Sequence, residues 1–327
     1  MPAGQIFAIF DGARGEPTLS SLCGDLLASQ RSSWPGLREG YEGLSAAKVR
    51  DIHGPGFSLK AQWNPRRIVS TAARLDPASI QARPCFLCRD NLPEAQRAIR
   101  CRRDYLVLCN PAPIFPQHYT IAHVHHRPQS IEPALADFLA LLRDFSPDFT
   151  VFYNGPQSGA SAPDHLHFQA APAGILPVET DIRAGRRLLL QKEMEGVAIF
   201  KAVGMGRAIL ILKGMQKERV AAALLKVIAA MRVVLNAPGE PMMNLLGSYG
   251  EGGWRILVFP RRKHRPSVFD LEGEAQVLIT PASVEMGGFL VTPREKDYHA
   301  LDARLAAAIF ADVSVDEETL LQMVDAL

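Results

Sequence analysis

The sequence predicts an α+β fold in which one unit, an antiparallel sheet flanked by helices, occurs twice. Three observations support this prediction. Apolar or alternating segments are separated by Asn-Pro, Phe-Pro and Gly-rich turns, as expected for strands of antiparallel sheets. Other segments have the apolar spacing of helices. The order strand, helix, strand, turn, strand appears once in each half, which indicates an internal duplication by element order alone.

Length and composition indicate an ordinary globular protein. The chain has 327 residues, 47% of them apolar and 21% charged, which is enough for one large core or two smaller ones. The net charge is only +2 and the longest cationic cluster covers residues 261–265, so nothing indicates a nucleic-acid partner. No apolar run approaches the roughly 18 residues of a membrane span, and the N-terminus lacks a secretory signal pattern.

The five cysteines include one C-x-x-C pair. An odd number of cysteines with one close pair favours a metal site in a reducing compartment over a disulfide framework. We therefore expect a cytoplasmic protein that associates with neither membranes nor nucleic acids.

We divide the chain into three expected parts. Residues 1–56 are rich in Gly, Ser and Pro and predict a helical and loop extension, with helices over 19–30 and 37–48. Residues 57–180 are expected to form the first unit and residues 181–327 the second.

Each unit is expected to contain several strands and one main helix. In the first unit we expect strands over 57–63, 104–109, 118–125, 149–153 and 166–171 and a helix over 133–143. In the second unit we expect strands over 208–213, 241–247 and 254–260 and a helix over 220–235.

The most informative segment covers residues 154–169 and ends in the sequence HLHFQ. Side chains alternate along a strand, so His165, His167 and Gln169 share one face while the apolar residues between them point into a core. The preceding loop is rich in small residues, and its N–H groups could bind an anion. A neutral imidazole is nucleophilic near pH 7 and leaves readily once reprotonated, which suits transfer of a phosphorus group.

Two histidines spaced in this way also occur on the surface of edge strands, without any chemistry. The loop of small residues before the strand and the glutamine after it favour the functional interpretation. A second motif, Cys85 and Cys88, can supply two thiolates to one tetrahedral metal, but zinc needs four nitrogen or sulfur ligands. Two plain buried thiols or a redox pair are the alternatives for these cysteines.

The HLHFQ segment resembles the active-site strand of the histidine-triad superfamily, in the branch whose third histidine is replaced by glutamine. That branch includes galactose-1-phosphate uridylyltransferase, diadenosine tetraphosphate phosphorylase and GDP-hexose phosphorylases such as GDP-L-galactose phosphorylase, to which the segment is most similar. The resemblance implies a fold of two histidine-triad-like units. It also implies that His167 is the nucleophile and that Gln169 holds the transferred phosphate.

The resemblance extends to other residues of the chain. Ser161 matches a small residue of the catalytic loop, although its spacing to His165 is one residue longer than in uridylyltransferases. The turn after Trp63 is similar to an Asn-Pro turn that lies against the nucleotide in that family. The substrate-binding set that the resemblance implies is Asn64, Arg66, Arg67, Asn154, Gly155, Ser158, Gly159 and Arg261. For the three arginines, a position in a solvated loop is the alternative.

The resemblance also completes the metal site. It implies a structural zinc held by Cys85, Cys88, His126 and His165, so that His165 orients the strand rather than reacts. His123 or His125 could take the place of His126. His118 is either a satisfied core histidine or a substrate contact.

The function that the resemblance implies is nucleotidyl transfer or phosphorolysis through a nucleotidyl-histidine intermediate. The donor would be a nucleoside diphosphate sugar or a dinucleoside polyphosphate, and the acceptor phosphate or a sugar phosphate. The strand over 254–260 carries Trp254-Arg255-Ile256-Leu257 in place of the motif, so we expect one chemical site per chain. A nucleotide hydrolase and a non-catalytic nucleotide-binding regulator are the alternatives, and a homodimer remains open because the sequence does not determine the oligomeric state.

Overall fold

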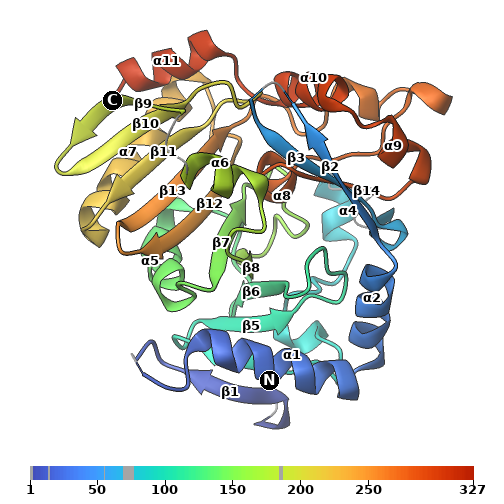
Figure 1. Cartoon of the computed structure of the whole chain (residues 1–327). Coiled ribbons are helices and arrows are strands. Elements are labelled where there is room, and N and C mark those ends of the chain that lie inside the picture. Colours follow the sequence, from blue (N-terminus) through green and yellow to red (C-terminus); the bar gives the residue numbers. More distant parts are fainter. Residues whose placement is uncertain (1–2, 14, 55, 69–76, 184–186) are drawn as a thin grey trace.

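The structure, a computed structural model, describes residues 3–13, 15–54, 56–68, 77–183 and 187–327. Within these ranges an eleven-stranded sheet forms the centre of the molecule (Figure 1). Its strands follow one another across the sheet in the order β1 (Ile6–Phe10), β4 (Ala98–Cys101), β5 (Tyr105–Cys109), β6 (Tyr119–His123), β8 (His167–Pro172), β7 (Phe149–Asn154), β12 (Met243–Gly250), β13 (Gly253–Pro260), β11 (Leu210–Gly214), β10 (Val197–Ala202) and β9 (Leu188–Met194).

The same topology occurs in both halves of this sheet. In the first unit the strands lie in the order β5-β6-β8-β7, and α5 (Leu135–Asp144) connects β6 to β7. In the second unit they lie in the order β10-β11-β13-β12, and α7 (Lys217–Val234) connects β11 to β12. The units meet where β7 and β12 pair in antiparallel fashion, with Asn154 opposite Asn244. The predicted α+β fold is therefore confirmed.

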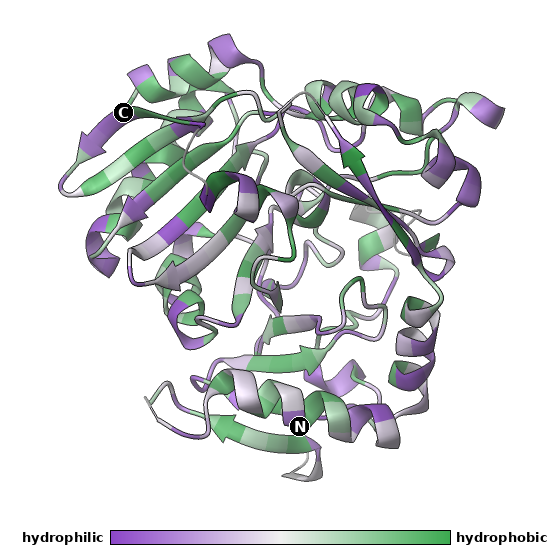
Figure 2. Ribbon diagram, viewed as in Figure 1, coloured by the Kyte–Doolittle hydropathy of each residue, from purple (hydrophilic) through white to green (hydrophobic). Residues whose placement is uncertain are grey.

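The sheet separates two hydrophobic cores. Along β7, Val151 and Tyr153 belong to the core that includes α5 and α7, while Phe152 belongs to the core on the opposite face. Each fully buried Val, Leu or Phe contributes roughly 1.5–3 kcal/mol, so both faces of the sheet stabilise the fold. Figure 2 shows the long hydrophobic stretches in the sheet that this burial requires.

Residues 1–56 contribute to both sheets of the molecule. Strand β1 pairs in parallel with β4, and α1 (Leu19–Ser33) packs against β1, β4 and β5. Helix α2 (Pro35–Ser45) follows, and the expected helix over 37–48 ends earlier than predicted because β2 (Lys48–His53) begins there. The division of the chain at residues 56 and 180 remains a prediction.

A second sheet of three strands joins distant parts of the chain. Strand β3 (Ser58–Trp63) pairs with β2 in antiparallel fashion and with β14 (Phe289–Thr292) in parallel. The remaining α-helices in the described ranges are α4 (Pro77–Gln81), α6 (Pro177–Arg183), α8 (Ser283–Met286), α9 (Glu295–Ala300), α10 (Ala303–Val313) and α11 (Glu317–Asp325). No helix in the described ranges has the length and apolarity to cross a membrane.

Candidate active site

The central strand of the first unit, β8, carries His167 and Gln169. This strand pairs with β6 on one side and β7 on the other, so its backbone is fixed from both directions. Phe168 points into the core, where its ring stacks on that of Phe138 at a centroid distance of 5.3 Å. His167 and Gln169 point to the opposite face, as alternation along the strand predicts.

His167 is held in a state suited to nucleophilic attack. Its Nδ1 donates a hydrogen bond to the carbonyl oxygen of His165 at 2.8 Å. Because a carbonyl oxygen can only accept, the proton of the neutral ring lies on Nδ1 and Nε2 carries the lone pair. Among the described residues Nε2 has no hydrogen-bond partner, although it is buried. Burial also lowers the pKa of His167 to about 4, so the ring is neutral near pH 7.

Gln129 connects the ends of β7 and β8 beside this histidine. The pairing of the two strands ends at Phe152 and Gln169. Beyond that point the Gln129 side chain donates from Nε2 to the carbonyl oxygens of Asn154 (2.9 Å) and His167 (3.0 Å). Its Oε1 accepts from the backbone N–H of His167 at 2.8 Å. Sequence reasoning missed Gln129, because no motif marks a glutamine in an irregular segment.

Gln169 contacts His118, whose role the sequence did not determine. His118 Nε2 and Gln169 Oε1 are 2.8 Å apart, and His118 is buried with 1% exposure. The backbone N–H of Ile114 donates to the other ring nitrogen of His118 at 3.2 Å. Burial lowers the pKa of His118 to about 4. His118 thus belongs to the site as a neighbour of Gln169.

The loop between β7 and β8 is held by the second unit. The Oδ1 of Asn154 accepts hydrogen bonds from Asn244 Nδ2 (3.0 Å) and from the Ser283 N–H (2.8 Å) and hydroxyl (2.7 Å). Asn244 also donates to the carbonyl oxygen of Ser158 at 2.7 Å. Gly159 has φ of +91°, and a Cβ there would lie 2.7 Å from that of Ala282, so the position requires glycine.

Two N–H groups of the expected anion-binding loop are already engaged. The Gly155 N–H donates to the carbonyl oxygen of Met243 at 3.1 Å, and the Ser158 N–H donates to that of Gly155 at 2.8 Å. The Ser158 hydroxyl is buried and has no partner among the described residues, whereas Ser161 is exposed. The groups of this loop that are candidates for phosphate binding therefore lie after Ser158 rather than at the start of the loop.

Arg261 lies in the interior and not in a solvated loop. It is fully buried, and burial lowers its pKa to about 9. Its five N–H groups are all used: they donate to Asn244 Oδ1 and to the carbonyl oxygens of Pro281, Lys263, His264 and Val313. No N–H group of Arg261 is left for a substrate in this arrangement, so it acts on the site by holding Asn244.

The Asn-Pro turn lies beside the His118–Gln169 pair. The Asn64 amide is buried and donates to the carbonyl oxygen of Pro113 at 3.3 Å. Arg67 donates to the carbonyl oxygen of Ala112 at 2.9 Å, and its charge contributes to the lowered pKa of His118. Arg66 is exposed, as the alternative of a solvated loop predicts.

The four predicted metal ligands lie together. The ligand atoms of Cys85, Cys88, His126 and His165 all lie within 4.8 Å of one another. The Cys85 sulfur is 3.3 Å from His165 Nδ1, and the Cys88 sulfur is 3.2 Å from His126 Nδ1. Ligands of a tetrahedral zinc ion lie roughly 3.6 Å apart for a sulfur and nitrogen pair, so the donor set fits this ion.

Outer contacts orient the two histidines of this cluster. His165 Nε2 donates to the carbonyl oxygen of His123 at 2.7 Å, which turns Nδ1 toward the sulfurs. His126 Nε2 lies 3.9 Å from the carboxylate of Asp164. The side chain of His123 accepts the N–H of His125 at 3.0 Å, and neither residue is part of the cluster. His126 is therefore the second histidine, as expected.

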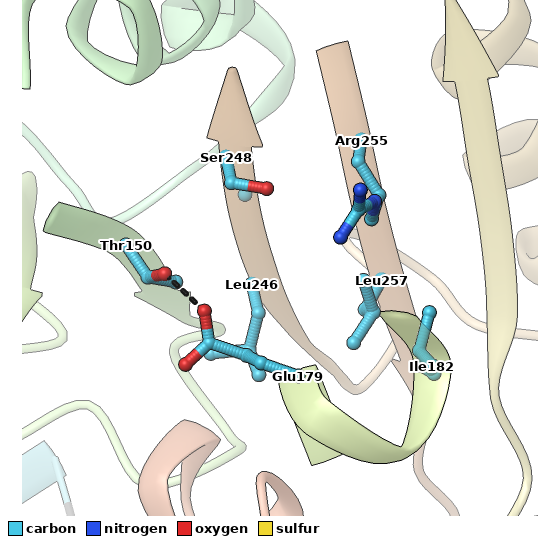
Figure 3. A pocket seen from close by; sticks show the side chains of 8 residues that line it. Thr150, Glu179, Ile182, Leu246, Ser248, Arg255 and Leu257 are labelled. Atoms are coloured by element: carbon cyan, nitrogen blue, oxygen red, sulfur yellow. Dashed lines mark hydrogen bonds between the residues drawn. The ribbon is translucent and has the colours of Figure 1, made fainter. Parts of the chain in front are cut away.

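A small cavity lies where the two units meet, between β7 and α6 on one side and β12 and β13 on the other. Figure 3 shows this cavity, in which Thr150 donates to Glu179 on one side and Ser248 and Arg255 lie on the other. Its volume is about 10 Å³, which is only enough for about one water molecule. This cavity is too small for a nucleotide.

The two-unit sheet, the HLHFQ strand and the Cys/His cluster are the features by which this chain resembles the histidine-triad branch with glutamine in the third position. Residues 26–172 match the family model "Domain of unknown function (DUF4922)", and residues 186–326 match "GDPGP1-like, C-terminal domain". No curated protein sequence matches the chain. The family match in the second half confirms the predicted resemblance to this branch.

Solved structures of yeast Ap4A phosphorylase Apa2 share the fold. The complex with Ap4A is 16% identical over 89% of this chain and 97% of its own, with a TM-score of 0.60. The complex with AMP is 15% identical over 89% and 96%, also with a TM-score of 0.60. A further structure of the same enzyme is 14% identical over 86% and 94%, with a TM-score of 0.55.

Proposed function

We propose that this chain is a nucleotidyl-transferring phosphorylase. His167 attacks the α-phosphorus of a nucleoside diphosphate sugar or a dinucleoside polyphosphate, and phosphate or a sugar phosphate then accepts the nucleotide. The observation that carries the proposal is the Nε2 of His167, which is unprotonated and unpartnered because Nδ1 donates to the His165 carbonyl. The yeast enzyme with this fold is a phosphorylase solved with AMP and with Ap4A, which supports a nucleotide substrate.

Transfer proceeds in two steps: His167 Nε2 forms a bond to phosphorus in the first and loses it in the second. In the first, the lone pair of Nε2 forms a bond to phosphorus, and the phosphorus–oxygen bond to the leaving group, a sugar phosphate or a nucleoside polyphosphate, breaks. The ring then carries positive charge, which the His165 carbonyl stabilises through the Nδ1 proton. In the second, an acceptor oxygen attacks phosphorus and the electron pair of the nitrogen–phosphorus bond returns to Nε2.

Gln169 favours transfer to phosphate over hydrolysis. Its amide can donate to a phosphoryl oxygen but cannot remove a proton from water, as a third histidine could. A phosphate acceptor brings its own anionic oxygen and needs no base. The N–H groups and the hydroxyl of the segment from Gly159 to Ser161, together with Asn64 and Arg67, are the proposed contacts of the phosphates and the nucleotide. Because Nε2 is buried, donor binding must open a path to it.

The metal that fits the Cys/His cluster is a structural zinc ion. Cys85, Cys88, His126 and His165 would hold it, and His165 would thereby fix the start of β8 relative to the loop that carries the cysteines. All four protein ligands are present, which is typical of structural rather than catalytic zinc sites.

Intact-protein mass spectrometry tests the proposal. The protein is incubated with Ap4A or with GDP-sugars, without and then with inorganic phosphate. We expect a mass increase of one nucleoside monophosphate that disappears when phosphate is added and is absent in His167→Ala. Turnover that leaves no adduct and inverts configuration at phosphorus would contradict the intermediate. Release of nucleotide without any acceptor indicates a hydrolase, and binding without turnover of any donor indicates a regulator.

A further inference from the structure

His118 is a buried titratable residue to which the two chemical steps assign no role. Its ring lies between Phe115 and Phe152, with centroid distances of 5.8 and 6.1 Å, so it has little freedom to turn. Both ring nitrogens nevertheless have polar partners within the described structure, the N–H of Ile114 and the side chain of Gln169. A histidine held at both nitrogens determines which of them carries the proton.

The contact with Ile114 fixes the tautomer of His118. A backbone N–H can only donate, so Nδ1 of His118 must be the acceptor of the 3.2 Å hydrogen bond. In the neutral ring the proton is then on Nε2. Nε2 therefore donates to Gln169, at 2.8 Å from its Oε1.

This N–H donor in turn determines the orientation of the Gln169 side-chain amide. Only the carbonyl oxygen of the amide can accept from Nε2–H, so the oxygen faces His118 and the NH2 group faces away from it. In the flipped amide, NH2 would oppose another donor, and the carbonyl oxygen would take the outward position. A phosphoryl oxygen needs a donor there, and a carbonyl oxygen would repel it.

We propose that His118 is a positioning residue that commits the Gln169 amide to presenting its NH2 group to the transferred phosphate. The proposal rests on the proposed function for its effect on rate, but the tautomer and the amide orientation stand independently of it. The chain of donors runs from Ile114 through His118 to Gln169 and ends at the substrate. His118 itself does not contact the reacting atoms.

Two substitutions of His118 distinguish the contribution of Nε2 from that of Nδ1. The Gln side chain places a polar group near the position of Nε2 and keeps a donor for Gln169. The Asn side chain reaches only the position of Nδ1 and loses that donor. We expect His118→Gln to stay within a few-fold of the wild-type kcat and His118→Asn to lose about 10- to 100-fold in kcat with a smaller change in KM, because a loosely positioned group costs this much. His299→Asn, at an exposed histidine, is the matched control.

Two further measurements distinguish positioning from loss of structure. In a Gln169→Ala background the difference between His118→Gln and His118→Asn should disappear, because only Gln169 transmits it. Nitrogen NMR of histidine-labelled protein should show His118 in the Nε2–H tautomer, with the signal assigned by its loss in His118→Asn. The Nδ1–H tautomer would overturn the inference even if no donor substrate is turned over. Equal losses in both substitutions, or a difference that persists without Gln169, would also overturn it while leaving the role of His167 intact.

Discussion

The two units of the central sheet have the same topology but different loops between their last two strands. In the first unit, residues 155–166 connect β7 to β8, whereas in the second only residues 251–252 connect β12 to β13. The long connection contains the glycine- and serine-rich segment and places His165 in the Cys/His cluster. The short connection is a tight turn, beside which Tyr249 and Trp254 pack edge to face at 4.6 Å. Both units thus have the same sheet, and the long loop that contributes to the site occurs in the first unit.

The second unit still supports the site of the first. Asn244 on β12 binds Asn154 and the carbonyl oxygen of Ser158, and Arg261 at the end of β13 binds Asn244. The site therefore depends on both units even though its reactive groups come from one. We propose that the second unit is a scaffold whose side chains hold the catalytic loop from the far side of the unit boundary.

The largest difference in rate should appear between alanine substitutions on β8 and on β13, which occupy the same place in the two units. His167→Ala should lower the rate of transfer by at least about 10⁴-fold, because it removes the proposed nucleophile. Arg255→Ala on β13 should leave the rate within a few-fold, because its cavity holds no more than about one water molecule. Steady-state rates and melting temperatures of both variants provide the measurement. A strong loss in Arg255→Ala with normal stability would show that the second unit also has a chemical role.

The next effect concerns the metal cluster, which only the first unit has among the described residues. Cys88→Ser should lower the zinc content from about one per chain toward zero and the melting temperature by an amount on the order of 10 °C, because bound metal stabilises the folded state. Cys101→Ser, at a buried thiol outside the cluster, is the control and should keep its zinc. Elemental analysis and calorimetry decide the outcome. Wild-type protein that contains no metal, with both thiols freely titratable, would refute the zinc site.

Substitution of Gln129 should have a smaller effect on the rate of transfer and a measurable effect on the free energy of unfolding. Gln129→Leu leaves two carbonyl oxygens and one N–H of β7 and β8 without their partner, which costs roughly 1–3 kcal/mol in the free energy of unfolding. Displacement of His167 should lower kcat by about 10- to 100-fold. Gln322→Leu, at an exposed position of α11, is the matched control. An unchanged kcat in Gln129→Leu would mean that the backbone of His167 is held by β6 alone.

The smallest effect is a dependence of stability on pH to which both units contribute, through His118 and His167 in the first and His264 in the second. Burial lowers the pKa of His118 to about 4, and burial with the charges of Arg265 and Arg261 does the same for His264. An unfolded histidine titrates near 6.5, so between about pH 4 and 6.5 the unfolded chain binds more protons. Stability should therefore be complete above pH 6.5 and fall as the pH decreases toward 4. Chemical denaturation of His264→Gln across this range should show a shallower fall, and an unchanged slope would contradict a neutral His264 in the folded protein.

Most strands around the site could be predicted from the sequence because turns and alternation mark them. The expected strands over 104–109 and 149–153 differ from β5 and β7 by one residue at one end. The strands β1, β2, β4, β9, β10 and β14 were not predicted. Four of them, β1, β2, β9 and β14, lie at sheet edges, and β4 and β10 pair with β1 and β9, so their formation depends on partners that local sequence does not reveal.

Residues marked by a sequence motif were proposed for the site from the sequence, whereas residues that only tertiary structure brings there were not. The metal cluster was predicted from one C-x-x-C pair and a family resemblance, and the structure brings all four residues together. Gln129 and Asn244 were not predicted as parts of the site, because their roles arise only when β7, β8 and β12 come side by side. The assignment of Arg261 to the substrate failed to foresee its burial, since a cluster of charges such as that over 261–265 normally predicts a solvated surface.

The small sheet has a consequence for the order of events during protein synthesis. Strand β3 obtains one of its two partners from β14, more than two hundred residues later in the chain, and the N–H of Asn64 donates to the carbonyl oxygen of Thr292. The turn that carries Arg67 follows directly. While the ribosome is still making the second unit, this edge of β3 lacks its partner, so the first unit cannot complete the surroundings of the proposed site on its own. Maturation of the enzyme should therefore wait until nearly the whole chain has emerged, and the partly made protein should depend on chaperones to protect that open edge.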